Sequence, residues 1–114
     1  MFNYRPITVT SFAEPFDELA ANRVRSQFRE HVKFGHRLHV IDLDQLDAPN
    51  VLMLRSLIVA RRTARAAGGD VRLVNSRPGM RRLLALTGLS RVFPVHSRVI
   101  DAVRAFREQP RVAS

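Results

Sequence analysis

The side chains that could carry chemistry form small groups, and none has the spacing of a catalytic or metal-binding motif. His36 and His39 lie three residues apart in an expected strand, where alternation sends them to opposite faces. Asp42, Asp44 and Asp47 resemble an acidic Mg²⁺ turn, but no G-x-x-x-x-G-K-[ST] or G-x-G-x-x-G motif accompanies them. The chain also has no cysteine nucleophile and no G-x-S-x-G elbow. The sequence therefore predicts no enzyme activity, no metal and no cofactor.

Composition indicates one globular domain. The chain has 114 residues, of which 46% are hydrophobic and 25% are charged. No apolar run approaches the roughly 20 residues that span a bilayer, and no signal peptide opens the sequence. The absence of cysteine fits a reducing cytoplasm. We expect residues 1–114 to form a single cytoplasmic domain without membrane insertion, with a loose tail after Pro110.

The net charge of +9 favours anionic partners. Arginines gather on two expected helices, with Arg61, Arg62 and Arg65 on one and Arg77, Arg81 and Arg82 on the other. No aromatic residues alternate with them as base stacking would require, and no helix-turn-helix pattern is present. A basic nucleic-acid-binding module is therefore the second interpretation of this chain.

Apolar periodicity predicts strands that alternate with helices, and hence an α/β fold with a mainly parallel four-stranded sheet flanked by about four helices. Strands are expected at 7–12, 38–43, 71–74 and 92–95. Helices are expected between Asp17 and Gly35, between Asn50 and Gly68, between Ser76 and Gly88, and over 99–106. In the second helix, the spacing of Leu54, Leu57 and Ile58 assigns those residues to the core.

Three segments together resemble the STAS domain, the family of bacterial anti-sigma-factor antagonists. They are E-P-F-D-E-L-A-A-N-R-V-R from Glu14, D-L-D-Q-L-D-A-P-N-V-L-M-L-R-S-L-I-V-A-R-R from Asp42, and D-V-R-L-V-N-S-R-P-G-M-R-R-L-L-A-L-T-G-L-S-R-V-F-P-V from Asp70. The resemblance implies a STAS-like fold. The family normally has two strands before the first of these segments, whereas residues 1–12 leave clear room for only one.

The resemblance also locates a regulatory position that this chain has altered. Family members carry D-S-S-G where this chain has Asn50, Val51, Leu52 and Met53, and a partner kinase phosphorylates the second serine of that motif. Leu52 occupies the serine position and cannot accept phosphate. Helical geometry already assigns other residues to the core, so we expect Leu52 and Met53 to be exposed as a small apolar patch.

The resemblance implies a non-catalytic module that binds another protein. The implied partner is an anti-sigma factor or its kinase, a transporter subunit or a stress-signalling complex, and a homodimer stays open. Without the serine, binding would be constitutive or controlled by another input. The expected partner-binding residues are Asn50, Val51, Leu52, Met53, Arg55 and Ser56.

Overall fold

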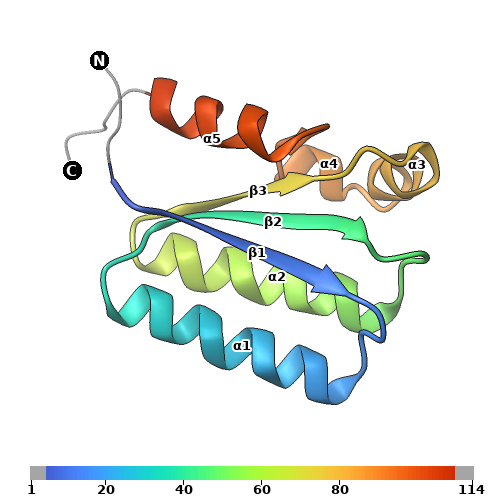
Figure 1. Ribbon diagram of the computed structural model, residues 1–114, viewed down its shortest axis with the longest axis horizontal. Helices are drawn as coiled ribbons and strands as arrows, with labels where there is room; N and C mark the ends of the chain where they lie inside the picture. Colours follow the sequence, from blue (N-terminus) through green and yellow to red (C-terminus); the bar gives the residue numbers. More distant parts are fainter. Residues whose placement is uncertain (1–4, 110–114) are drawn as a thin grey trace.

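A computed structural model describes residues 5–109 and contains one sheet of four parallel strands. Figure 1 labels β1, β2 and β3, which lie next to one another. The strands lie in chain order, β1-β2-β3-β4. Each of the three neighbouring pairs is parallel. Their bounds are Ile7–Ala13 for β1, Leu38–Gln45 for β2, Asp70–Val74 for β3 and Val95–His96 for β4. The predicted α/β class and strand number are confirmed.

Helices cover both faces of the sheet. Helices α1 (Glu18–Lys33) and α2 (Val51–Ala66) lie side by side on one face, and α5 (Val99–Glu108) lies on the other (Figure 1). The shorter helices α3 (Pro78–Leu86) and α4 (Leu89–Val92) follow β3 at the end where the strands terminate. None of the helices in residues 5–109 is long and apolar enough to cross a membrane.

Capping residues set the ends of the long helices. The Asp17 carboxylate accepts a hydrogen bond from the Ala20 amide at 2.9 Å and begins α1. The Asn50 side chain accepts one from the Met53 amide at 2.8 Å and begins α2. Gly35, with φ of 86°, follows α1 and ends it. These three boundaries follow the sequence prediction.

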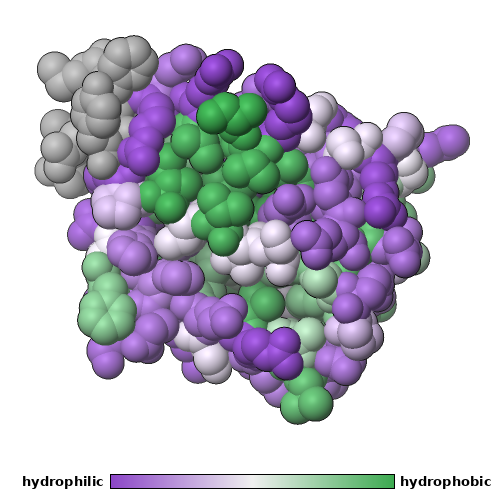
Figure 2. All heavy atoms as spheres, in the orientation of Figure 1, coloured by the Kyte–Doolittle hydropathy of each residue, from purple (hydrophilic) through white to green (hydrophobic). Residues whose placement is uncertain are grey.

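The core has two parts, one on each face of the sheet. The larger cluster fills the space between the sheet and α1 and α2, and includes Phe12, Phe28 and Leu57. The smaller cluster lies under α5 and includes Val40 and Phe106. Figure 2 shows a hydrophobic area on the near face, where α5 lies beside the strands.

The last strand differs from the prediction. Val92 was expected to begin a strand, but it ends α4, and β4 comprises only Val95 and His96. Gly88, with φ of 80°, allows a further helical turn to begin after α3, and this turn brings Phe93 into the core at 1% exposure. Anchoring Phe93 delays the strand by three residues. The predicted loose tail after Pro110 lies outside the described residues.

Candidate functional site

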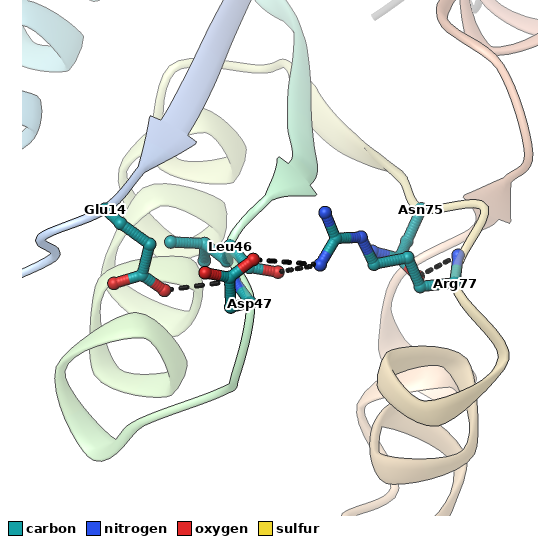
Figure 3. A network of polar contacts seen from close by, with 5 residues as sticks. All are labelled: Glu14, Leu46, Asp47, Asn75 and Arg77. Atoms are coloured by element: carbon teal, nitrogen blue, oxygen red, sulfur yellow. Dashed lines mark hydrogen bonds and ion pairs between the residues drawn. The ribbon is translucent and has the colours of Figure 1, made fainter.

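The loop that precedes α2 is held from two sides (Figure 3). On one side, the Glu14 carboxylate accepts a hydrogen bond from the Asp47 amide at 3.0 Å. On the other, Arg77 Nη1 donates to the Leu46 carbonyl oxygen at 3.3 Å and to the Asp47 carboxylate at 3.2 Å. Asn75 orients this arginine, because its Oδ1 accepts a hydrogen bond from the Arg77 amide at 2.9 Å. The loop is therefore fixed by segments that follow β1 and β3.

Asn50 belongs to the same framework. Its Oδ1 caps α2, and its Nδ2 donates to the Phe16 carbonyl oxygen at 3.3 Å. Both ends of the amide are used within the chain, although the residue as a whole is exposed. Its role in the structure is to fix where α2 starts and how the helix is joined to the β1–α1 connection.

The first turn of α2 does not present the apolar patch that the sequence predicted. Met53 is fully buried, at 0% exposure, and belongs to the larger core cluster. Leu52 is partly buried and packs against the same cluster. Conversely, Ile58 was predicted to face the core but is 44% exposed, and Val51 is 66% exposed. The buried side of α2 is thus rotated relative to the prediction.

The rotation follows from the two neighbours of α2. Met53, Leu57, Ala60 and Ala64 form the buried seam of the helix, with a spacing of three and four residues. A second side of α2, which includes Ser56, lies against α1 around a small hollow. Because two sides are covered, a surface centred opposite the seam remains for solvent.

We call that surface the outer face of α2, and it consists of Val51, Arg55, Ile58, Arg62 and Arg65. All five residues are exposed, and two apolar side chains alternate with three guanidinium groups. Of these five residues, only Arg65 forms an ion pair within residues 5–109, with the Asp70 carboxylate at 3.3 Å. The outer face therefore offers apolar contact area together with positive charge.

Of the six predicted partner-binding residues, Val51 and Arg55 lie on this outer face. Asn50 is exposed at its edge, Leu52 is partly buried, and the Met53 side chain is inaccessible. Ser56 is partly buried on the side that faces α1. The other three residues of the outer face are Ile58, Arg62 and Arg65. Ile58 follows Arg55 by three residues and precedes Arg62 by four, and this helical spacing could have placed it on the same exposed side as the arginines.

The acidic residues after β2 serve as hydrogen-bond acceptors within the chain. Asp42 accepts from the Asp44 amide at 2.9 Å, and Asp44 accepts from the Ser76 amide at 2.7 Å and hydroxyl at 3.0 Å. Asp47 pairs with Arg77, as described above. Across the described part of the chain, no three His, Cys, Asp or Glu side chains gather in a way that could hold a metal ion.

The histidines likewise have structural positions. His39 is fully buried, with Nδ1 2.7 Å from the Thr8 hydroxyl and its ring 4.2 Å from the Phe28 ring centroid. Burial lowers the pKa of His39 from 6.5 to about 4, so the ring is neutral at pH 7. His36 was predicted to lie in the same strand, but it precedes β2. Its ring stacks on that of His31, with the two ring centroids 5.6 Å apart.

The sequence analysis missed Glu14 and Arg77 as the residues that hold the loop. Their partner Asp47 is 33 and 30 residues away in the chain, respectively. No local pattern marks such contacts, since they arise only when parallel strands bring their ends to one edge of the sheet.

With this geometry in place, comparison with known proteins defines the class. The family model of the STAS domain matches residues 3–102, and the chain therefore belongs to the STAS domain family. Its similarity extends to the candidate anti-sigma factor antagonist BtrV of Bordetella bronchiseptica, which is 26% identical over 87 residues. That match covers 76% of this chain and 75% of the relative.

Two solved structures show the same fold. An anti-sigma factor antagonist from Mycobacterium paratuberculosis has a TM-score of 0.74 at 23% identity, covering 93% of this chain and 91% of that one. The Bacillus cell fate determinant SpoIIAA, in its phosphorylated form, has a TM-score of 0.69 at 19% identity, covering 88% of this chain and 91% of that one.

Proposed function

We propose that this chain is a regulatory module of the anti-sigma-factor-antagonist type, that it acts in the cytoplasm without catalysis, and that its protein partner binds the outer face of α2. Membership of the STAS family and the similarity to named antagonists support the class. The observation that carries the location is the pair of exposed apolar side chains, Val51 and Ile58, on a helix whose start is fixed by the loop before it.

The outer face has the composition of an interface. Val51 and Ile58 are seven residues apart, two helical turns, and so lie on one line along the helix. Arg55 and Arg62 lie along one side of this line and Arg65 lies on the other, and arginine is enriched at protein interfaces. A partner with an apolar groove bordered by acidic residues would complement this surface, in keeping with the net charge of +9.

Regulation by phosphate at the start of α2 is not expected. Leu52, at the position that corresponds by resemblance to the phosphorylated serine, has no hydroxyl. The nearest alternative, Ser56, is partly buried beside α1. Mass spectrometry after incubation with an anti-sigma-type serine kinase should find Ser56 unmodified, and stoichiometric phosphate there would contradict this part of the proposal.

The location is tested by removing the two apolar side chains. We expect Val51→Ser with Ile58→Ser to weaken capture of an anti-sigma-type kinase or other protein partner by at least about tenfold. The double change removes both apolar side chains from the centre of the proposed interface, where the residues whose truncation costs more than about 1 kcal/mol are concentrated. Leu86→Ser is the matched control, because Leu86 is 75% exposed on α3, away from this face.

Two results would count against the proposal. Partner binding that the double variant retains at full strength would place the interface elsewhere. Absence of any protein partner, together with salt-dependent binding to generic duplex DNA, would instead support the nucleic-acid interpretation.

A further inference from the structure

The two edges of the sheet differ in length and in protection. The edge strand β4 has only two residues and directly follows Pro94, which has no amide hydrogen to donate. The opposite edge strand, β1, has seven residues and pairs only with β2 within residues 5–109. Its outer edge therefore presents a row of backbone donors and acceptors.

The sequence of β1 contains almost none of the features that usually block such an edge. I-T-V-T-S-F-A has no charge, no proline and no glycine. A register irregularity occurs between Ser11 and Ala13, but Ile7 to Ser11 pairs regularly with β2. Val9 is 51% exposed in the middle of this regular stretch.

A groove runs along the free edge, between β1 and α1. One hollow of about 410 Å³ is lined by Val9, Thr10 and Ser11, three consecutive residues, together with Glu30 of α1. Because consecutive side chains of a strand point to opposite faces, contact with all three means that the hollow lies at the edge of the sheet. A second hollow, of about 370 Å³, continues past Ser11 toward the start of α1.

One pair of opposite charges along this groove is placed for two-fold pairing. Gln27 borders both hollows; the titratable residues Glu30 and His31 border only the first, and Glu14, Asp17 and Arg23 border only the second. Among them, Glu30 and Arg23 lie on α1, on opposite sides of Gln27. A two-fold axis near Gln27 would place Glu30 of one copy beside Arg23 of the other, and the reverse. An isologous interface requires such self-complementarity: if one residue of the first copy contacts a second residue of the other copy, then the reverse contact also forms.

We propose that the occupant of this groove is a second copy of the chain, which adds its β1 antiparallel to this β1. The two-fold axis makes the paired strands antiparallel, joins the two sheets through backbone hydrogen bonds, and sets the two α1 helices side by side. The exposed Val9 side chains of both copies become covered near the axis. The proposal is independent of the outer face of α2, which stays free in such a dimer.

The test measures self-association of the full chain by sedimentation equilibrium over a concentration series. The salt concentration is about 0.15 M, where the Debye length of about 8 Å screens general repulsion between chains of net charge +9. We expect a dimer that Val9→Lys weakens by more than about 30-fold, because the two-fold axis brings the two lysines together.

A charge exchange tests the predicted pairing more specifically. Arg23→Glu and Glu30→Arg should each weaken the dimer by about 2- to 30-fold, since symmetry repeats every altered pair twice. Combining the two changes should restore dimerisation to within about twofold of the unmodified chain. Arg62→Glu is the control, because it alters an exposed charge on α2, and it should leave the dimer unchanged.

Several outcomes would overturn the proposal. They are a chain that stays monomeric up to about 1 mM, a dimer that tolerates Val9→Lys, and an exchange that fails to restore association. A monomer whose edge instead binds an extended peptide would also overturn it, and would assign the groove to another protein. None of these outcomes bears on Val51 and Ile58, so the two proposals are tested separately.

Discussion

Burial increases along the first turn of α2, so truncating its side chains one at a time should reduce stability by increasing amounts. Val51, Leu52 and Met53 are consecutive residues that are exposed, partly buried and fully buried, respectively. All three variants place alanine, the residue with the highest helix propensity, in the same turn of the same helix, so helix propensity differs little among them. Differences in unfolding free energy among the three variants should therefore report mainly the loss of packing.

We expect Met53→Ala to cost about 2–4 kcal/mol, the lower part of the range for large core truncations, since neighbours of a flexible side chain relax partly into the space. For a domain of this size the cost corresponds to a drop of about 10–20 °C in Tm. Val51→Ala should stay within about 0.5 kcal/mol of the unmodified chain, with Leu52→Ala between the two.

Thermal and urea unfolding, followed by far-ultraviolet circular dichroism, measure all three variants. The Asn50 cap binds the backbone amide of residue 53, so it is retained in every variant. If Met53→Ala lowered Tm by less than about 4 °C, or if Val51→Ala were the most damaging of the three, then the assignment of the buried seam would be wrong.

Three further outcomes are expected. His39, whose pKa is lowered from 6.5 to about 4, is neutral when folded, so stability is retained above pH 6.5 and lost by up to about 3 kcal/mol as the pH falls to about 4. Urea midpoints at pH 7 and 4.5 should show this loss in the unmodified chain but not in His39→Gln. Gly69→Ala should destabilise by about 3 kcal/mol or more, because its Cβ would overlap the Arg37 carbonyl oxygen and lie 2.6 Å from the carbonyl carbon, and backbone atoms cannot easily move aside. Gly79→Ala, with open space around the Cβ, should be neutral or slightly stabilising. Arg62→Gln should change the unfolding free energy by less than about 0.5 kcal/mol, since Arg62 is exposed; a loss of several degrees in Tm would show that it is structurally paired.

The fold could be predicted because its signals are local in the sequence. Asp17 and Asn50 cap their helices through side chains that reach only three residues ahead, and Gly35 ends α1 through its own φ angle. The apolar run of β2 indicates burial on both faces wherever the strand is placed in the sheet. Alternation of such elements then leads to a parallel α/β sheet.

The sequence located the candidate site along the chain, at the start of α2, but it did not show which side chains of that helix are exposed. The start of α2 was located correctly, yet the exposure of Met53 and the burial of Ile58 were both predicted wrongly. A helix with apolar residues on several sides has no unique inward direction in its sequence. The direction was decided by α1, which covers the side of α2 that contains Ser56, and by the sheet, which covers the side that contains Met53.

By itself, the sequence determined the element types, most of their boundaries and the family, because caps, turns and apolar periods act within a few residues of one another. Only the tertiary structure decided which side of α2 reaches solvent, how Glu14 and Arg77 hold the preceding loop, and that no other strand of residues 5–109 pairs with the outer edge of β1. Each of these depends on contacts between segments some 30 residues apart or more, or on the lack of such contacts. The packing of the whole sheet sets those distances, and no local pattern encodes them.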